Sequence, residues 1–443
     1  MAMSDKPGRS VVPATSIGRR RFLRGAAATA GVFAFADVGR VQSAFARTTA
    51  LPPPEASGIE HIIVVMMENR SFDHFLGWFP HADGRQRGLT YFDSAGVPHG
   101  THRLSPDFQG CGHPDPDHSY EGGRIAYDNG ACDGWLRAGS NDEYAIGYYT
   151  KQDLSFFADA AKRWTVCDRY FSAIMAPTYP NRIYQHAAQT DRLTNSLALS
   201  FLPTIWDRLD DAGLEGRYYY SDVPFLALWG PRYLPIARPF ASFLADAAAG
   251  TLPQVAFVDP RFLGEGNGTS NDDHPFADIR SGEAFLNQVY SAVTKSPAWP
   301  HTLLVINYDE WGGFFDHVPP TLAPIPEADR RAGDADGRRG FRTPCLVVSP
   351  FAPADVSSVE LDHTSVLRTI EWRWGLPALT VRDQTANNLA EILDFSKPDL
   401  KAKQFRDPTG PFGGPCATAT TLAAASDKWE QLRQMAAASG WPV

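Results

Sequence analysis

Short apolar runs rich in β-branched residues recur along the chain, and longer segments with helical spacing of apolar residues separate them. Such runs are typical of strands in a parallel sheet that helices cover on both faces. The clearest strands are expected at 59–66, 255–258, 303–307 and 345–348. Helices are expected at 71–79, 154–162, 182–190, 240–249, 282–294, 363–374 and 421–438. The pattern predicts an α/β fold with a mainly parallel central sheet sandwiched by helices.

The segment from about residue 80 to residue 150 is rich in Gly, Pro and Asp. It shows neither the apolar runs expected of strands nor the spacing of apolar residues expected of helices. Loops of this length in a compact domain usually carry function, as lids or binding rims. Ligands of open α/β sheets bind beyond the carboxyl ends of the strands. We therefore expect long loops from this segment to form a lid over the carboxyl edge of the sheet.

The first 46 residues carry the parts of an export signal in order. The twin-arginine pattern Arg19-Arg20-Arg21-Phe22-Leu23 precedes a mildly apolar stretch, and Ala44-Phe45-Ala46 is a small-x-small cleavage site. The apolar stretch is too short to cross a bilayer, and no later segment approaches a transmembrane span. We expect export by the twin-arginine pathway to the periplasm, the cell surface or the medium, and a catalytic domain over residues 47–443.

Removing this signal leaves a strongly acidic chain. The full sequence contains 41 Lys and Arg and 50 Asp and Glu. Seven of the basic and two of the acidic residues lie in the first 46, so the remainder holds 34 basic and 48 acidic side chains and a net charge of −14. A protein that binds duplex nucleic acid carries the opposite sign. Nucleic acid is therefore not an expected partner.

The five cysteines show no CxxC motif and no metal-finger spacing. In an oxidising compartment Cys111 could pair with Cys132. The odd count leaves at least one cysteine unpaired, so the chain is not expected to be a disulfide scaffold.

Two pairs of oxygen-bearing side chains follow predicted strands directly. Glu68 and Asn69 follow the first predicted strand, and Asp309 and Glu310 follow the third. Both pairs should leave the carboxyl edge of the sheet. Carboxylate and amide oxygens without cysteine favour a hard divalent cation. Each pair alone is more commonly a helix cap or a solvated loop, but the long apolar strands before both pairs favour a metal site.

Thr178 opens a helical segment, and the N–H groups at a helix start attract anions such as phosphate. A threonine hydroxyl is a poor nucleophile unless a base or a metal favours its alkoxide. A metal held by the two oxygen pairs would supply that activation. A lone threonine at such a position more commonly caps the helix, so the sequence leaves both roles open.

His118 and His274 lie in loops that contain several carboxylates. Such surroundings keep a histidine cationic above its ordinary pKa, which suits phosphate binding or protonation of a leaving oxygen. His317 lies close in sequence to Asp309 and Glu310 and is a further candidate. The remaining loop histidines that we weighed are interpreted as exposed or structural: His61, His81, His99, His102 and His301.

Together these motifs resemble the bacterial phosphoesterase family of phospholipases C and respiratory-burst-inhibiting acid phosphatases. The resemblance rests on EHIIVVMMENRSFD (60–73), APTYPNR (176–182), NDDHP (271–275) and YDEWGGFFDHV (308–318). It spans about residues 58–376 and implies an alkaline-phosphatase-like fold, one catalytic divalent metal ion and a covalent phosphoryl-enzyme intermediate.

The resemblance also implies a role for each motif residue. The implied metal ligands are Glu68, Asn69, Asp309 and Glu310, with Thr178 as nucleophile and fifth ligand. His118 and His274 would bind phosphate, with Asn69, or act as acid and base; Asp115, Arg182 and His317 are further candidates. The metal would be calcium, magnesium, manganese, zinc or iron, because an oxygen-rich site with histidine nearby accepts any of them.

A threonine at position 178 resembles the phospholipase branch of the family. The acid phosphatase branch looks to use a serine at this position instead. We therefore expect hydrolysis of phosphatidylcholine-type lipids to diacylglycerol and a phosphorylated head group through phosphothreonine. An acid phosphatase acting on small phosphate monoesters is the alternative. A metal-dependent envelope binding protein without catalysis is a third interpretation. A sulfatase is disfavoured, because threonine cannot be oxidised to the aldehyde that sulfatases use.

Several aromatic residues in the loop-rich regions could contact a lipid surface transiently or enclose a choline group. They are Trp78, Phe79, Trp135, Tyr148 and Tyr149. The expected partner is therefore a phospholipid or a small phosphate ester, without a transmembrane anchor.

Overall fold

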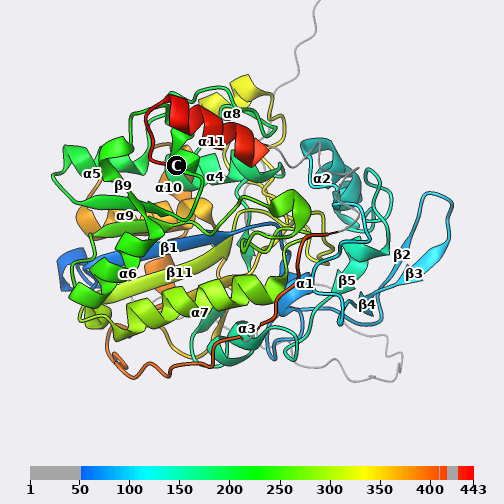
Figure 1. The fold of residues 1–443 in the computed structure, drawn as a ribbon, viewed down its shortest axis with the longest axis horizontal. Coiled ribbons are helices and arrows are strands. Elements are labelled where there is room, and N and C mark those ends of the chain that lie inside the picture. Colours follow the sequence, from blue (N-terminus) through cyan, green and yellow to red (C-terminus); the bar gives the residue numbers. More distant parts are fainter. Residues whose placement is uncertain (1–50, 409, 417–427) are drawn as a thin grey trace, which may run out of the picture. The chain divides into compact units, whose positions relative to one another are not determined.

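An eight-stranded sheet runs through the centre of the chain in the computed structural model (Figure 1). The strands in spatial order are β13 (Val356–Ser357), β6 (Thr165–Cys167), β12 (Cys345–Val348), β11 (Thr302–Tyr308), β1 (His61–Met67), β10 (Val255–Val258), β8 (Gly216–Tyr220) and β9 (Ala237–Pro239). Within this sheet β12 runs antiparallel to both of its neighbours, and the other strands share one direction. The predicted mainly parallel sheet is confirmed.

The structure describes residues 51–408, 410–416 and 428–443. The predicted export signal lies outside these residues, as does the first part, 421–427, of the predicted C-terminal helix. The described residues belong to one compact unit. Within them, no helix is both long enough and apolar enough to cross a membrane.

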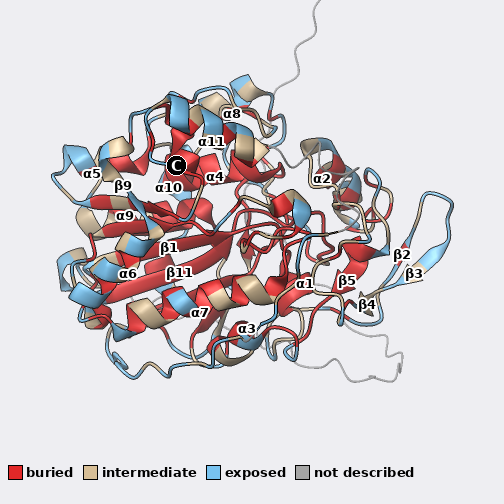
Figure 2. Cartoon of the chain, viewed as in Figure 1, coloured by how far each residue is buried: buried red, intermediate tan, exposed pale blue. Residues whose placement is uncertain are grey.

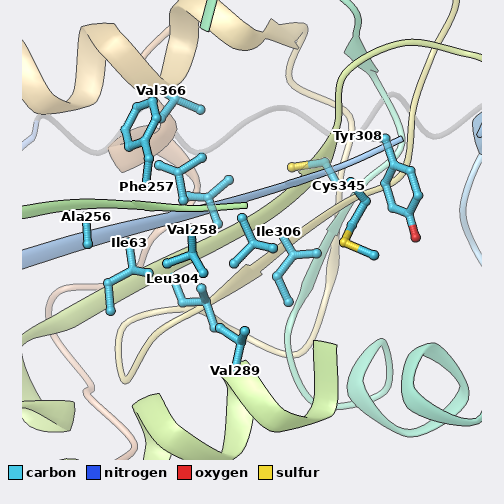
Figure 3. Close-up of a cluster of buried hydrophobic side chains, with 14 of the residues drawn as sticks. Ile63, Ala256, Phe257, Val258, Val289, Leu304, Ile306, Tyr308, Cys345 and Val366 are labelled. Carbon is cyan, nitrogen blue, oxygen red and sulfur yellow. The ribbon is translucent and has the colours of Figure 1, made fainter. Parts of the chain in front are cut away.

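Helices cover both faces of the sheet, and Figure 1 shows α3, α6 and α7 on one face and α4, α5 and α9 on the other. The helices are α1 (Phe72–Leu76), α2 (Tyr120–Tyr127), α3 (Ser155–Ala160), α4 (Thr178–Ala187), α5 (Ile205–Asp211), α6 (Phe240–Ala249), α7 (Ile279–Lys295), α8 (Glu327–Ala332), α9 (His363–Trp374), α10 (Val381–Thr385) and α11 (Lys428–Ala438). Figure 3 shows the resulting core, with Val366 of α9 and Val289 of α7 on opposite sides of the strands. Both side chains are fully buried.

The central strands β1 and β11 lie in the middle of the sheet because their sequences are continuously apolar. All seven residues of β11 are buried, and in β1 only His61 reaches intermediate exposure. These two strands are parallel neighbours, aligned from His61 opposite Thr302 to Met67 opposite Tyr308. The residues that follow the two strands therefore lie side by side at the carboxyl edge of the sheet, and the candidate site forms there.

Helix α4 begins at Thr178, four residues before the predicted start. Pro180 lies in its first turn, where a missing N–H costs no intrahelical bond. The helix ends at Ala187 because Ala188 adopts a left-handed conformation with φ of 55°. In contrast, α6 and α9 span the ranges that their spacing predicts.

The segment from 80 to 150, which was expected to consist of long loops, also contains short strands. It contains an antiparallel hairpin of β2 (Thr90–Phe92) and β3 (Pro98–Gly100), and a parallel pair of β4 (His102–Arg103) and β5 (Gly147–Tyr148). A further parallel pair lies elsewhere and consists of β7 (Tyr170–Phe171) and β14 (Leu361–Asp362). Figure 1 shows the β2–β3 hairpin projecting away from the sheet, and much of its surface is exposed in Figure 2.

The disulfide joins Cys111 to Cys416, so the pairing of Cys111 with Cys132 is wrong. Cys132 is a buried free thiol, as are Cys167 and Cys345. The true partner lies 305 residues away in sequence. Spacing along the chain carries no information about such a contact, which depends on the folded path of both segments.

The prediction of exposed aromatic residues is also partly wrong. Trp135 and Tyr149 are fully buried, and Tyr148 is buried as well. Trp78 and Phe79 keep intermediate exposure and line a surface pocket of about 880 Å³ together with Lys151. Only this pair still fits the expected contact with a lipid surface.

Candidate active site and metal centre

The two predicted oxygen pairs meet at the carboxyl edge of the sheet. Asn69 N donates to Asp309 Oδ1 at 3.0 Å, and Asp309 N donates to Met67 O at 3.0 Å. Asn69 has a φ of 59°, a left-handed conformation that asparagine tolerates better than most residues. The side chains of Glu68, Asn69, Asp309 and Glu310 are all fully buried. The strand alignment thus packs three carboxyl groups and one amide into one small region.

Thr178 lies against this region at the first residue of α4. Its Oγ1 donates to Glu68 Oε2 at 3.1 Å and approaches Asn69 Oδ1 at 3.4 Å. The N-cap of α4 is Pro177, and no side chain caps the helix, so the capping interpretation of Thr178 is wrong. The hydroxyl instead lies at a helix N-terminus, where phosphate groups bind favourably.

Arg182 lies one helical turn after Thr178 and forms a buried ion pair. Its Nε donates to Glu68 Oε1 at 2.6 Å and lies 3.7 Å from Asp309 Oδ2, and its Nη1 donates to Asp259 Oδ1 at 3.1 Å. Burial alone would lower the pKa of Arg182, but the charges of Glu68, Asp259 and Asp309 outweigh it and raise the pKa. The guanidinium therefore stays cationic and offsets part of the acidic charge.

One arginine does not satisfy all three carboxylates. Burial raises the pKa of Glu68 and of Glu310 well above the ordinary value, and burial also raises the pKa of Asp309. Among the described residues, Asp309 Oδ2 and Glu310 Oε1 are buried atoms without a hydrogen-bond partner. Buried carboxylate oxygens normally have a partner or bind a cation. The donor set therefore fits a hard divalent ion.

His118 and His274 approach this region from two separate loops. His118 Nε2 lies 3.4 Å from Asn69 Nδ2 and 3.9 Å from Glu310 Oε1. His274 Nε2 lies 3.8 Å from Asp115 Oδ2, and the two imidazole centres are 5.9 Å apart. Burial lowers the pKa of His274 to about 4. The structure thus brings Asp115 and both predicted histidines together beside the oxygen pairs.

His317 is not brought to this cluster. Its Nδ1 lies 2.5 Å from Asp73 Oδ2 and its Nε2 lies 3.1 Å from Asp83 Oδ1. Two consecutive left-handed glycines separate it from Glu310, and a Cβ on Gly312 would lie 2.1 Å from the Asn69 carbonyl oxygen. This turn directs the chain away from Thr178, so closeness in sequence to Glu310 does not give closeness in space.

Two groups of side chains offer at least three ligand atoms within 4.8 Å of one another in the described chain. One contains Asp115, His118 and His274, and the other contains Asp73, Asp316 and His317. Neither includes the carboxylates at the ends of β1 and β11.

Sequence reasoning missed several groups that position the site. His363 Nε2 donates to the Asp309 carbonyl oxygen at 2.6 Å. The Asp272 carbonyl oxygen accepts from Glu68 N at 2.8 Å, and burial raises the pKa of the Asp272 side chain to about 8. Asp272 stands in the 271–275 motif and had a local signal. His363 and Asp259 had none, because only the tertiary fold brings them to the site.

Comparison with known proteins places the chain. The Phosphoesterase family matches residues 59–377. Non-specific phospholipase C6 of Arabidopsis thaliana is 31% identical over 76% of this chain and 72% of that protein. Phospholipase C B of Mycobacterium tuberculosis is 31% identical over 89% of each chain.

Among solved structures, an alkaline phosphatase superfamily protein of Vibrio parahaemolyticus is 10% identical, with a TM-score of 0.38 over 86% of this chain and 90% of that chain. That distant similarity adds nothing to the assignment of the site. The match to the Phosphoesterase family covers most of the sequence and includes all the motifs that build the site. The chain belongs to the phosphoesterase family.

Proposed function

We propose that this chain is a metal-dependent phospholipase C-type hydrolase that converts phosphatidylcholine-type lipids to diacylglycerol and a phosphorylated head group. One observation carries the proposal. The Thr178 hydroxyl lies at a helix N-terminus, 3.1 Å from Glu68 Oε2 and beside buried carboxylate oxygens that have no hydrogen-bond partner among the described residues. The relatives named as phospholipases C support the lipid substrate class.

In this proposal Glu68, Asn69, Asp309 and Glu310 hold one divalent cation, with Thr178 Oγ1 as a further ligand. When bound, the cation lowers the pKa of the threonine hydroxyl and offsets negative charge on the phosphoryl oxygens. The oxygen donor set accommodates calcium, magnesium or manganese, and the adjacent histidines extend the range to zinc and iron.

The first half of the reaction forms a bond between Thr178 Oγ1 and phosphorus. The bond from phosphorus to the glycerol oxygen breaks, and diacylglycerol leaves after its oxygen takes a proton. Thr178 lies at the N-terminal end of α4, and this end of a helix favours a negatively charged phosphoryl group. Asn69, His118 and His274 are the proposed phosphate contacts, and a histidine is the proposed proton donor.

The second half regenerates the threonine. Water attacks phosphorus and loses a proton, the bond to Thr178 Oγ1 breaks and this oxygen takes up a proton, and the phosphorylated head group leaves. Arg182 holds Glu68 in place through its 2.6 Å contact, and its charge opposes the rise that burial causes in the pKa of Glu68. Glu68 Oε2 is thereby positioned to accept the hydrogen bond of the regenerated hydroxyl.

The test is mass-spectrometric analysis of the products from phosphatidylcholine vesicles. Purified protein is compared with Thr178→Val and with protein depleted of metal by a chelator. Diacylglycerol plus phosphocholine from the first sample, and neither product from the other two, is the expected result. Phosphate release from a simple monoester without lipid turnover would move the assignment to an acid phosphatase. Bound metal with no turnover of either substrate would favour a binding protein.

We also propose export by the twin-arginine pathway, with residues 47–443 as the mature catalytic domain in the periplasm, at the cell surface or in the medium. The support is the sequence Arg19-Arg20-Arg21 followed by the cleavage site at Ala44-Phe45-Ala46. Replacing all three arginines by lysine should retain the full-length precursor in the cytoplasm, which cell fractionation and immunoblotting would measure. Unchanged export of that variant would refute the pathway.

A further inference from the structure

A surface pocket of about 880 Å³ lies outside the proposed active site, and Trp78 and Phe79 form part of its wall. None of the side chains assigned to the metal, to the nucleophile or to phosphate lines it. The lining residues come from four stretches of the chain, 77–87, 150–152, 161–162 and 354–356. These stretches follow α1, precede α3, follow α3 and lead into β13, so only the fold brings them together. We call this hollow the Trp78 pocket.

Two aromatic rings give one side of the Trp78 pocket an apolar surface. The rings of Trp78 and Phe79 pack edge to face with their centres 5.7 Å apart, and both residues keep intermediate exposure. The indole N–H of Trp78 donates to the Phe75 carbonyl oxygen at 2.6 Å. Because this bond satisfies the only polar group of the ring, the part of the indole that faces solvent is apolar. Aromatic rings of this kind are enriched where proteins meet the boundary between lipid head groups and acyl chains.

Four exposed basic side chains line the same pocket. They are Arg85, Arg87, Lys151 and Lys162. Lys162 lies 3.6 Å from Asp159, and the other three form no ion pair within the described residues. Asp355 is the one acidic residue of the lining, so four positive charges and one negative charge leave a net charge of +3. The pocket therefore combines apolar rings with three cations that are unpaired in the described chain.

This local charge is opposite in sign to that of the whole protein. The full chain carries a net charge of −9, and the chain after the predicted export signal carries −14. Charges separated by more than about 8 Å are largely screened at physiological ionic strength. A ligand at the pocket therefore responds mainly to the adjacent cations, whereas the rest of an acidic protein offers an anion little attraction. An anionic surface would bind this protein in one orientation, with the Trp78 pocket toward it.

Buried hydrogen bonds hold the basic segments in place. The buried Gln86 donates through Nε2 to the carbonyl oxygens of Asp73 at 2.9 Å and Tyr149 at 2.7 Å. Arg85 N donates to Asp73 Oδ1 at 2.7 Å. The segment that carries Arg85 is thereby fixed to α1 and to the strand residue that precedes the loop of Lys151. The cations of the pocket project from a preformed scaffold, which lowers the entropic cost of binding.

We infer that the Trp78 pocket docks the protein on a bilayer that contains anionic phospholipids. The basic side chains bind phosphate groups of the lipid heads, and Trp78 and Phe79 enter the boundary between heads and acyl chains. A soluble phosphate ester could use the cations, but it would leave the aromatic surface in water, so a bilayer fits the whole pocket better. The inference rests on the proposed phospholipid substrate. It adds where the protein meets the membrane and which lipid charge that surface selects.

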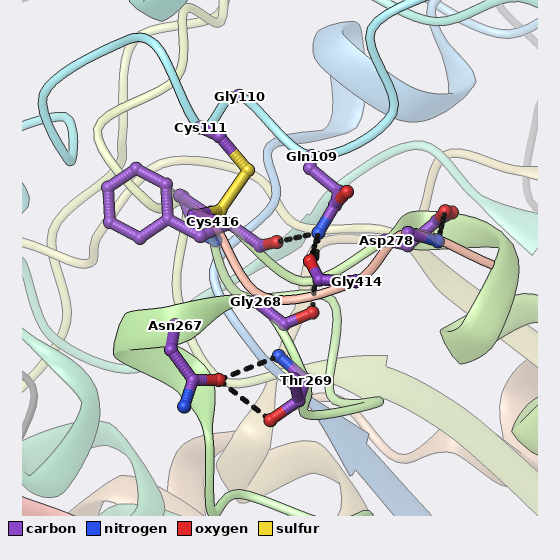
Figure 4. The surroundings of a disulfide bond; sticks show 12 residues. Gln109, Gly110, Cys111, Asn267, Gly268, Thr269, Asp278, Gly414 and Cys416 are labelled. Carbon is purple, nitrogen blue, oxygen red and sulfur yellow. Dashed lines mark hydrogen bonds between the residues drawn. A yellow bond between two sulfur atoms is a disulfide. The ribbon is translucent and has the colours of Figure 1, made fainter. Parts of the chain in front are cut away.

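Cosedimentation with sucrose-loaded vesicles measures docking. The purified protein is mixed with vesicles of phosphatidylcholine alone or of phosphatidylcholine and phosphatidylglycerol in equal amounts. Affinity should be higher for the anionic vesicles and should fall as salt is added. The double substitution Arg85→Gln and Lys151→Gln should weaken binding to the anionic vesicles about 25-fold, because each basic side chain near such a surface contributes about fivefold. Reductant is left out, because the disulfide between Cys111 and Cys416, which Figure 4 shows, belongs to the folded protein.

Arg330→Gln combined with Arg331→Gln is the matched control. It removes the same two charges from exposed side chains, but neither residue lines the pocket. Both lie on α8, which Figure 1 shows at the top of the view, whereas α3 lies at the bottom. This variant should bind anionic vesicles as tightly as the unsubstituted protein does.

A loss of affinity in the pocket variant alone supports the inference. Equal affinities of the two double variants would overturn it, and so would equal affinity of the unsubstituted protein for both kinds of vesicle. Far-UV circular dichroism checks that each variant is folded.

Brominated lipids test the aromatic part of the surface. Bromine on the acyl chains quenches a tryptophan only at close range, so protein on brominated anionic vesicles should fluoresce less than on matched unbrominated vesicles. Trp78→Phe should remove most of this difference, because it keeps an aromatic ring in the pocket and loses the indole. Quenching of the same size in Trp78→Phe and in the unsubstituted protein would overturn the assignment of this surface.

Turnover is recorded separately from docking. The protein with Arg85→Gln and Lys151→Gln should hydrolyse a soluble chromogenic phosphodiester as fast as the unsubstituted protein, since neither residue belongs to the proposed active site. Vesicle binding without release of diacylglycerol would refute the proposed function and support the docking surface. Calorimetric binding of glycerol phosphate that is lost in the double variant, with no binding to vesicles, would assign the pocket to a soluble ester and overturn the inference.

Discussion

The Thr178 hydroxyl donates to Glu68 Oε2 at 3.1 Å, across 110 positions of sequence. The contact joins the start of α4 to the end of β1, and it directs the hydroxyl into the cluster of buried carboxylates. A carboxylate that accepts this hydrogen bond orients the oxygen and increases its electron density, and a cation in the same cluster would favour its ionised form.

Replacing Thr178 by valine should abolish phosphoester hydrolysis while the fold is kept. Valine has nearly the same shape, so the packing at the start of α4 is preserved and only the hydroxyl is lost. We expect kcat to fall by about three orders of magnitude or more, as in other enzymes that lose a nucleophile. Turnover of a chromogenic phosphodiester measures it.

Thr178→Ser is the control, because it keeps the hydroxyl. It should retain far more activity than the valine variant. Equal activity of the valine variant and the unsubstituted protein would remove Thr178 from the mechanism.

Arg182→Gln should destabilise the protein strongly. The substitution leaves Glu68 and Asp259 buried without their cationic partner, and breaking a buried ion pair in this way costs about 3–5 kcal/mol. Urea unfolding followed by tryptophan fluorescence measures the loss. The control is Arg331→Gln, since Arg331 forms an exposed pair with Glu327 that should contribute little. Equal midpoints for the two variants would contradict the buried-pair argument.

Removing the cation should lower the free energy of unfolding, and adding it back should restore it. A cation that binds only the folded state at one hundred times its Kd contributes about 2.7 kcal/mol. Thermal unfolding of chelated protein, with and without added calcium, magnesium, manganese or zinc, measures the effect and ranks the ions.

Glu310→Gln should remove most of the stabilisation that a hard ion gives. Without any cation, the same variant should be as stable as the unsubstituted protein or more stable, because a buried carboxyl with a strongly raised pKa becomes an uncharged amide. A variant that responds fully to calcium and magnesium would show that Glu310 is not a ligand.

Non-reducing peptide mapping should recover one crosslinked peptide that contains Cys111 and Cys416. Cys132 should react with an alkylating agent once the unreduced protein is unfolded. We expect Cys416→Ser to lower the free energy of unfolding by about 2–5 kcal/mol, because the crosslink closes a very long loop. A crosslink between Cys111 and Cys132 would refute this connectivity.

Protonated His317 should stabilise the folded protein, and this contribution should be lost as the pH rises above neutrality. Burial alone would lower the pKa of His317, but the hydrogen bond to Asp73 and the charges of Asp73 and Asp316 outweigh it and raise the pKa above 6.5. Asp83 also faces the ring, and Arg342 opposes these carboxylates. The folded state therefore holds the proton more tightly than the unfolded state. Its contribution is complete below pH 6.5 and is lost as the pH rises through the folded pKa.

Urea unfolding between pH 5.5 and pH 9 measures this dependence, and these limits lie about one unit below and about two and a half units above the ordinary histidine pKa. His317→Gln should show a shallower fall in stability with rising pH than the unsubstituted protein. His113→Gln, at a partly exposed loop histidine, should keep the original slope. The same slope in both variants would contradict the role of His317.

Local pattern was sufficient for much of the fold. The apolar runs at β1, β10, β11 and β12 located four sheet strands to within two residues. The sequence alone predicted that Glu68 and Asp309 lie close together, because the carboxyl ends of parallel strands meet at one edge of the sheet. The antiparallel direction of β12 was not predictable, since a buried strand has the same composition in either direction.

Contacts between segments far apart in sequence could not be predicted from the sequence pattern. Cys132 had the better spacing to Cys111, yet Cys416 is the partner, because the segment that carries it packs against Gln109. His317 stood near Glu310 in sequence, yet two left-handed glycines turn it toward Asp73. In both cases the deciding interaction joins segments that no local pattern relates.

The sequence by itself determined the class of the fold, the family and most of the side chains from which the site is built, because periodicity reports burial and motifs report chemistry. The tertiary structure alone decided how these side chains are used. It placed Arg182 among the carboxylates, left Asp309 Oδ2 and Glu310 Oε1 without hydrogen-bond partners in the described chain, and set Asp115 beside His274. The physical reason is that charge compensation and ligand geometry depend on distances of a few ångströms between residues far apart in sequence, and only the packed core fixes those distances.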